Sequence, residues 1–380
     1  MAFIRKIGNY KPISRKLLAI LLSAALAITS VGGWAVYAIL IPNKTEPEAE
    51  YIETNTDAAV HPSERRLAKS LHWRFSDLPP ALVSTAIIPG LKSTRTTVGK
   101  LHAITTCTSM TPQGMAVTED YIFISAYCHT HKHNSVIYML NRHTHDFIKE
   151  IVLPNRAHVG GMAYDPVHRY IWVSGGTSGA AKAVAYPLET IEEYDLDADN
   201  RPIKATFSYT LASIDRNSYM TYNNKSLLIG YFSTDGESTL QRFDITEKGG
   251  LQSQIIADYD EVHESVTADF LATTSKWIQG VAAANNKIVL SASYGVLDSE
   301  LQVYSNENVD ADDNFTRSNA LRVLHFPRMM EQIYMYDDKL YCLFESGAFA
   351  YRRYPGERMD RILIIDLDWV LNRSENTSQL

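Results

Sequence analysis

A short run of alternating histidines supplies the clearest candidate metal ligands in the sequence. His129, His131 and His133 stand at alternate positions, and alternate side chains of an extended strand point to the same face. With His158 further along the chain, they predict a site for a divalent transition metal such as zinc. Because Lys132 adds a positive charge and no acidic residue lies in the run, a solvated loop without metal is the competing interpretation.

Calcium is the other divalent ion to consider. Calcium sites favour clustered carboxylate and carbonyl oxygens. Asp310, Asp312 and Asp313 are the nearest approach to such a cluster, and they fall in a predicted surface loop. Calcium therefore has no better support than zinc.

Glu345 is the best single candidate for acid–base chemistry. It follows the apolar segment 340–344, and burial there would raise the pKa of its carboxyl group into a useful range. An ion pair with Arg352 or Arg353 is the structural alternative. The sequence contains no nucleophile elbow, phosphate loop, dinucleotide fingerprint or zinc-protease helix.

The three cysteines exclude a disulfide framework, because their number is small and odd. Cys107 and Cys128 are predicted to approach each other on one face, where they could form a bridge. Cys342 lies in an apolar strand and is expected to be a buried core residue.

An internal repeat would position these residues. Five segments each contain two short apolar strands joined by a turn, and they begin at Gln113, Gly160, Ser218, Gln279 and Gln332. Third strands are predicted at Ser135–Leu140, Thr190–Leu196, Thr239–Ile245, Glu300–Tyr304 and Arg361–Leu367. Fourth strands are predicted at Phe147–Leu153, Ile203–Leu211, Leu251–Ala257 and Leu321–Phe326. Four strands recurring every 40–60 residues or so indicate an all-β propeller.

The last repeat lacks a fourth strand. The apolar segment Ala81–Pro89 has no partner of its own, and pairing it with the last repeat would close the ring and remove an exposed edge. This arrangement predicts five blades. A sixth, degenerate blade within Asp258–Lys276 is the alternative, although that stretch fits better as an excursion with a short helix.

In a propeller the first strand of each blade lines the central channel, and the loops before it and after the second strand share one face. Polar groups that converge at such an opening are the default candidates for a binding site. The predicted ligand-binding residues are Gln113, Tyr127, His158, Ser174, Ser218, Tyr231, Gln279, Ser291, Tyr294, Gln332 and Glu345. A purely structural role for the glutamines, as caps of strand ends and links between blades, is the alternative.

The N-terminal region predicts a membrane anchor. A basic segment, 1–16, precedes an uncharged stretch at 17–42 that is long enough to cross a bilayer. The basic flank predicts that the rest of the chain lies outside the cytoplasm, and a cleaved signal peptide would give the same location. An acidic stalk is predicted over 43–80, with a short helix around Ser63–Lys69, then the propeller over 81–370 and a tail over 371–380.

The net charge of −7 gives no support for nucleic-acid binding.

The repeat resembles bacterial propellers with YVTN- or NHL-like blades between about Leu82 and Leu367. The segments Thr111–Gly114, His158–Gly161, Leu290–Gly295 and Leu343–Ala348 look like parts of exported Gram-positive propellers. This resemblance implies a fold and an extracytoplasmic location, and it supplies no catalytic residues. Ser291–Val303 looks faintly like a blade of the five-bladed glutaminyl cyclases.

Three functions follow as hypotheses. The first is a cell-surface binding module for a saccharide or peptide. The second is an enzyme, a lyase, hydrolase or cyclotransferase, that uses Glu345 or the histidine run. The third is a scaffold in a surface complex. The fold alone does not choose between them.

Overall fold

The structure is a computed structural model that describes residues 53–176, 180–258, 261–284, 286–305 and 315–372. The chain divides into two units, 1–42 and 43–380, and every described residue belongs to the second. The predicted basic segment, the membrane anchor at 17–42, the beginning of the stalk and residues 373–380 lie outside the described residues. Among the described helices, none has the length and apolar character needed to cross a membrane.

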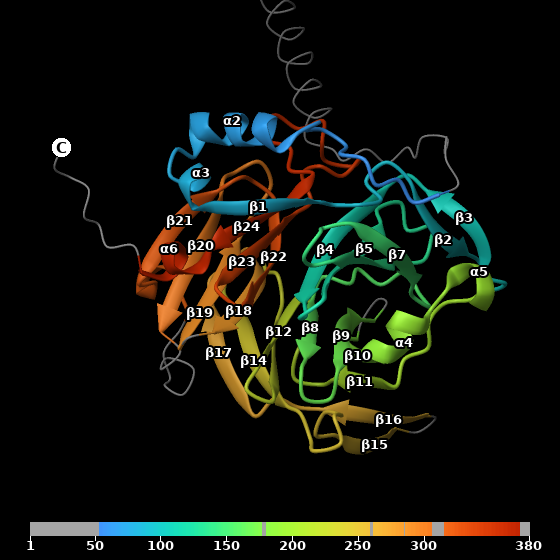
Figure 1. Cartoon of the computed structure of the whole chain (residues 1–380). Helices are drawn as coiled ribbons and strands as arrows, with labels where there is room; N and C mark the ends of the chain where they lie inside the picture. The colour runs from blue at the N-terminus through green and yellow to red at the C-terminus, as the bar shows by residue number, and fades with distance from the viewer. Residues whose placement is uncertain (1–52, 177–179, 259–260, 285, 306–314, 373–380) are drawn as a thin grey trace, which may run out of the picture. The chain divides into compact units, whose positions relative to one another are not determined.

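The described residues form a five-bladed β-propeller (Figure 1), as the repeat predicted. The first blade contains β4 (Met110–Val117), β5 (Tyr121–Cys128), β6 (Val136–Asn141) and β7 (Phe147–Val152). The fourth contains β18 (Ile278–Ala284), β19 (Lys287–Ala292), β20 (Ser299–Ser305) and β21 (Arg322–Phe326). Strands β4 and β5 are buried along almost their whole length, because neighbouring blades cover both faces of the inner strands.

The ring closes through the N-terminal strand, as predicted. The fifth blade consists of β22 (Met330–Tyr336), β23 (Lys339–Phe344), β24 (Arg361–Asp366) and β1 (Leu82–Ile87). Strand β1 runs antiparallel to β24, with Thr85 opposite Leu363. This pairing joins the two ends of the domain and protects the edge that β24 would otherwise expose.

The second blade corrects one prediction. It contains β8 (Met162–Asp165), β9 (Tyr170–Gly175), β10 (Lys182–Pro187) and β11 (Phe207–Leu211). The predicted third strand at Thr190–Leu196 is wrong, because this stretch contributes to the helices α4 (Leu188–Glu193) and α5 (Leu196–Asp199). Leu188 and Ile191 are buried three positions apart, which is the spacing of one helix face and differs from the two-residue period of a strand.

The third blade differs from the prediction in its fourth strand. Its strands are β12 (Tyr219–Asn223), β13 (Ser226–Gly230), β14 (Ser238–Asp244) and β17 (Phe270–Thr274). The predicted fourth strand at Leu251–Ala257 is wrong. Instead, β15 (Gln254–Asp258) pairs with β16 (Glu261–Val266), and this hairpin extends the edge of the second blade through β11. The stretch predicted as a helical excursion thus supplies strands to two blades, and the described residues form no sixth blade.

The described part of the predicted stalk packs on the propeller. Helix α2 (Glu64–Arg74), which overlaps the predicted helix at Ser63–Lys69, begins at the N-cap Ser63 and is followed by α3 (Leu78–Ala81). Leu67 and Leu71 are fully buried in a core cluster shared with the fourth and fifth blades. From α2 onward, this stretch therefore belongs to the domain.

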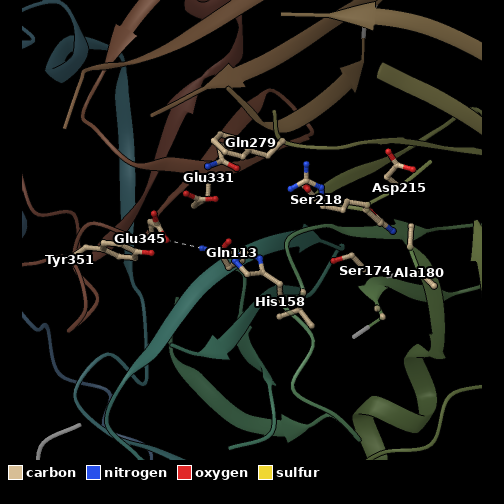
Figure 2. A pocket seen from close by; sticks show the side chains of 17 residues that line it. Gln113, His158, Ser174, Ala180, Asp215, Ser218, Gln279, Glu331, Glu345 and Tyr351 are labelled. Carbon is tan, nitrogen blue, oxygen red and sulfur yellow. Dashed lines mark hydrogen bonds between the residues drawn. The ribbon is translucent and has the colours of Figure 1, made fainter. Parts of the chain in front are cut away.

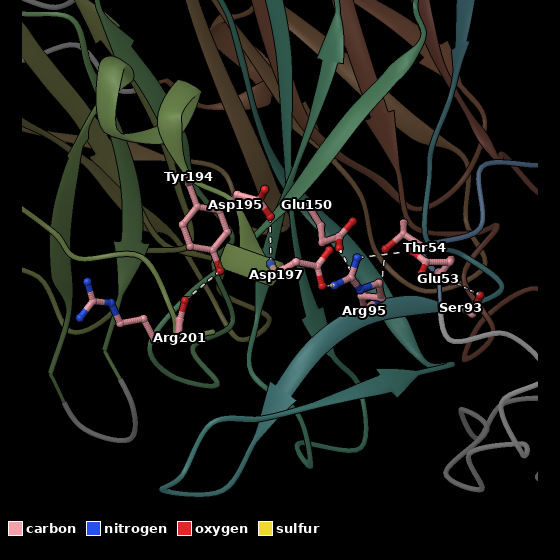
Figure 3. A network of polar contacts seen from close by, with 9 residues as sticks. All are labelled: Glu53, Thr54, Ser93, Arg95, Glu150, Tyr194, Asp195, Asp197 and Arg201. Atoms are coloured by element: carbon pink, nitrogen blue, oxygen red, sulfur yellow. Dashed lines mark hydrogen bonds and ion pairs between the residues drawn. The ribbon is translucent and has the colours of Figure 1, made fainter. Parts of the chain in front are cut away.

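A separate hairpin covers part of the first blade. It consists of β2 (Thr94–Val98) and β3 (Ala103–Cys107). Arg95 in β2 pairs with Glu53, with Glu150 of β7 and with Asp197 of α5, and Figure 3 shows this network. The arginine thus ties the hairpin to both the first and second blades.

Candidate ligand-binding site at the channel

One glutamine closes the middle of the channel. The amide nitrogen of Gln332 in β22 donates to the carbonyl oxygens of Met162 and Met220, and its Oε1 accepts from the N–H of Met162. These bonds join the fifth blade to the second and third blades across the ring. The channel is therefore divided into two openings, one at the starts of the first strands and one at their ends.

The opening at the strand starts is a pocket of about 460 Å³. All five blades contribute to its lining. Its polar and aromatic lining residues are Gln113, His158, Ser174, Asp215, Arg216, Asn217, Ser218, Phe232, Gln279, Glu331, Glu345 and Tyr351. Figure 2 shows ten of the lining residues labelled around the cavity.

Small residues let the blades converge around this pocket. A Cβ atom on Gly160 would lie 2.3 Å from the carbonyl oxygen of Ser218 in the next blade. Nearby serines of the second strands then link the blades: Ser125 donates to Val159 O, and Ser291 donates to Glu331 O. The predicted ligand residue Ser291 is therefore buried and makes a bond between blades.

Two carboxyl groups meet at one side of the pocket. Glu331 is buried, and Glu345 is partly exposed to the cavity. Gln113 donates to Glu345 Oε2 over 2.9 Å, as the dashed line in Figure 2 marks. Burial raises the pKa of Glu345 to about 8, and burial together with the charge of Glu345 raises the pKa of Glu331 well above its usual range. Because the two carboxyl groups hydrogen-bond to each other and both pKa values are raised, the pair shares at least one proton at neutral pH.

Aromatic and imidazole side chains surround this pair. The hydroxyl groups of Tyr351 and Tyr127 interact with each other, and the ring of Tyr127 lies 4.2 Å from that of His158 between centroids. Burial, with smaller contributions from His131 and His129, lowers the pKa of His158. His158 is therefore a neutral imidazole at neutral pH, able both to donate and to accept a hydrogen bond.

An aromatic stack stands beside the cavity. Phe232, a lining residue, stacks on Tyr294 with centroids 6.3 Å apart, and Tyr294 lies parallel to Trp277 at 5.2 Å. Tyr294 is 46% exposed, so the stack presents an aromatic surface to solvent next to the hydrogen-bonding groups of the pocket.

The structure brings six of the eleven predicted ligand residues to this pocket: Gln113, His158, Ser174, Ser218, Gln279 and Glu345. Tyr127 lies behind His158, and Tyr294 stands in the aromatic stack. Tyr231 is outside the lining and packs against Arg216. Gln332 links blades through its side-chain hydrogen bonds. This is the structural role that was the alternative prediction for the glutamines.

The histidine run does not form one three-ligand group. The chain turns after Cys128, where the N–H of His131 bonds to Cys128 O, and His131 has a φ of 56°. The strand geometry that would align the three rings is therefore absent. Within the described residues, the group of potential ligands that does come together is Cys107, Cys128 and His133.

The contact between Glu345 and Glu331 was not predicted from the sequence. Glu331 precedes Gln332 at the start of β22, and its position at the start of a first strand was the available signal. Arg328 contributes to the electrostatic environment of Glu345, whereas no ion pair joins Glu345 to Arg352 or Arg353 among the described contacts. The carboxyl–carboxyl contact arises within the fifth blade, because the antiparallel pairing of β22 with β23 puts Met330 opposite Phe344 and the N–H of Glu345 on Met329 O.

Comparisons with known proteins identify no family for this chain. No protein-family model and no curated protein sequence matches the chain. Similar solved structures include Kuenenia stuttgartiensis hydrazine synthase, with 11% identity and a TM-score of 0.31 over 61% of this chain and 55% of that one. The β-propeller domain of the Trilobed protease from Pyrococcus furiosus has 12% identity and a TM-score of 0.31, over 63% of this chain and 80% of that one. The β-propeller domain of Myceliophteria thermophila Cps50 (Swd1) has 9% identity and a TM-score of 0.34, over 67% of this chain and 96% of that one. This chain is thus a five-bladed β-propeller by its own strand pairing.

Proposed function

We propose that the protein is a binding module that takes a small, neutral saccharide in the pocket at the channel face. The observation that carries this proposal is the combination of uncharged hydrogen-bonding groups with an exposed aromatic stack. The amides of Gln113 and Gln279 and the hydroxyls of Ser174 and Ser218 match the hydroxyl groups of a sugar. Aromatic rings such as Tyr294 offer a flat apolar face for the C–H side of a sugar ring.

The charge state of the buried lining residues Glu331, Glu345 and His158 favours a neutral ligand over a charged one. The shared proton of Glu331 and Glu345 keeps the pair short of two full charges, and His158 is neutral. The formal charges of Asp215 and Arg216 stand at the exposed rim and have opposite signs. A peptide ligand would be the outcome to consider if glycans fail to bind.

Replacing Tyr294 by alanine is expected to weaken saccharide binding about fivefold, because one aromatic contact is worth roughly 1 kcal/mol. The measurement is calorimetry with the best ligand from a glycan array, using the full-length protein. Leu297→Ala is the matched control, since Leu297 is exposed in the same loop and outside the pocket lining. Unchanged affinity in Tyr294→Ala and in Gln279→Ala would refute this location.

An enzyme is the second candidate, and the carboxyl pair favours it. Glu331 and Glu345 form a proton-sharing pair at a ligand-sized cavity, an arrangement suited to moving a proton to and from a bound molecule. The raised pKa of Glu345, about 8, lies near neutral pH. Hydrolysis or elimination on a saccharide would use this pair as acid and base.

If the bound saccharide is turned over, Glu331→Gln and Glu345→Gln are each expected to lower kcat by about 100-fold or more, the usual contribution of general acid–base groups. KM should change far less, because glutamine preserves the size and hydrogen bonding of each side chain. Product formation over days by chromatography is the measurement. Absence of turnover in wild type would leave the binding function and reject the enzymatic one.

We also propose that residues 17–42 anchor the chain in a membrane with the propeller outside the cytoplasm. The support is the uncharged length of this segment and its basic N-terminal flank.

A further inference from the structure

Two cysteines and one histidine form a group beside the first blade that the channel site does not use. The ligand atoms of Cys107, Cys128 and His133 all lie within 4.8 Å of one another. None of the three lines the pocket. Both cysteines are buried, and no disulfide joins them.

Three different elements deliver these ligands. Cys107 ends β3 of the separate hairpin, Cys128 ends β5 of the first blade, and His133 lies in the loop that leads back to β6. The hydroxyl of Ser109 stands 3.8 Å from each of the two sulfur atoms. The group is therefore built by the tertiary fold, and sequence spacing alone would not assemble it.

The distances fit a tetrahedral ion. Cys128 Sγ lies 3.4 Å from His133 Nδ1. In a zinc site with Zn–S near 2.3 Å and Zn–N near 2.0 Å, a tetrahedral angle puts these two atoms about 3.5 Å apart. The corresponding sulfur–sulfur separation is about 3.8 Å. Since all three ligand atoms lie within 4.8 Å of one another, no pair would need to close by more than about 1.3 Å.

We propose that Cys107, Cys128 and His133 bind one thiophilic metal ion, with zinc as the expected occupant. Two thiolates and one imidazole are the soft ligands that zinc prefers, and two thiolates balance its charge. Three protein ligands leave a fourth position for water or for the Thr130 hydroxyl, whose oxygen lies 3.1 Å from Cys128 Sγ. The backbone N–H of His133 also bonds to Cys128 Sγ, a contact that orients a metal-bound sulfur.

The position of the site assigns the ion a structural role. Its ligands come from both the hairpin and the first blade, which are otherwise joined here by hydrogen bonds between Asn134 and the backbone or side chains of Thr96 and Thr97. A metal ion shared between them would fasten the hairpin to the blade. The site is therefore independent of ligand binding in the channel.

Cobalt and zinc binding to the full-length protein test this proposal. The protein is purified with reductant, stripped with chelator and titrated with Co²⁺ and then Zn²⁺. The expected result is one ion per chain, a thiolate-to-cobalt charge-transfer absorption that zinc abolishes, and a melting temperature raised by several degrees at saturating zinc.

Matched variants separate this site from the rest of the histidine run. His133→Gln is expected to weaken zinc binding at least tenfold, and Cys128→Ser to weaken both zinc binding and the charge-transfer absorption, since only the Cys107 thiolate remains. His131→Asn is the control, because His131 is exposed in the same loop and asparagine tolerates its positive φ. If Cys128→Ser fails to fold, His133→Gln still tests the proposal. His133 is only partly buried, so its substitution is expected to leave the fold intact.

Three outcomes would overturn the assignment. One is a cobalt complex without thiolate absorption. Another is zinc affinity that falls in His131→Asn and stays unchanged in His133→Gln. The third is a Cys107–Cys128 disulfide, mapped by mass spectrometry in protein purified without reductant, together with no metal binding after reduction.

Discussion

Gln332→Ala is expected to lower the free energy of unfolding by about 3 kcal/mol or more, since each buried polar group left without a partner costs about 1–3 kcal/mol. The substitution removes the partner of three backbone groups: the carbonyl oxygens of Met162 and Met220 and the N–H of Met162. It also leaves a cavity where Gln332 is fully buried. The central connection between three blades would be lost in one step.

Urea denaturation followed by tryptophan fluorescence measures this effect. Gln252→Ala is the control, because Gln252 is exposed, and its midpoint should stay close to that of wild type. A Gln332→Ala protein as stable as the control would show that water replaces the glutamine in the channel at no net cost, contrary to the role assigned to this residue.

The architecture could be predicted because blades repeat a local pattern. Inner strands are buried on both faces, so each appears in the sequence as a short apolar run, and the turns between first and second strands are tight. Closure through residues 81–89 followed from an unpaired edge in the last blade, and β1 confirms it.

The outer strands could not be predicted so well, because they pack on one face and their sequences are less distinctive. Residues 190–196 contain apolar side chains spaced among polar ones, with Glu192 and Glu193 adjacent, and they contribute to helices in the connection that follows β10. The true third strand, β10, contains three alanines or valines in Lys182–Pro187 and carries a weaker signal. In the third blade, the fourth strand comes after the β15–β16 hairpin, and only the three-dimensional pairing reveals that insertion.

The candidate site shows the same division between local and long-range information. Repeat register predicted which polar residues converge, and six of them line one pocket. Register did not predict that Glu331 contacts Glu345, since the contact depends on side-chain directions at the irregular end of the β22–β23 pairing. The Cys107–Cys128–His133 group depends on a turn that breaks the strand geometry assumed for the histidines.

The carboxyl pair predicts an unusual dependence of stability on pH. Burial raises the pKa of Glu345 from 4.5 to about 8, and Glu331 is shifted in the same direction. Between these pH values the folded protein holds more protons than the unfolded chain, so the free energy of unfolding falls as pH rises. The stabilisation is fully present below about pH 4.5 and is lost as pH passes through 8. The groups that face Glu345 are Glu331, Gln113, Arg328, Tyr127 and Tyr351.

Glu345→Gln is therefore expected to flatten this dependence and to make the protein more stable than wild type at pH 8. Each proton retained only by the folded state contributes at most about 1.4 kcal/mol per pH unit. Because Glu345 is partly open to the pocket, we expect a gain of about 2 kcal/mol at pH 8 and almost none at pH 5, on the same linkage argument. Urea denaturation at pH 5, 6, 7 and 8 measures both curves, with Glu119→Gln, an exposed position in the first blade, as the control. Parallel curves for wild type and Glu345→Gln would mean that Glu345 ionises normally in the folded protein, and the acid–base role of the pair would then lose its physical basis.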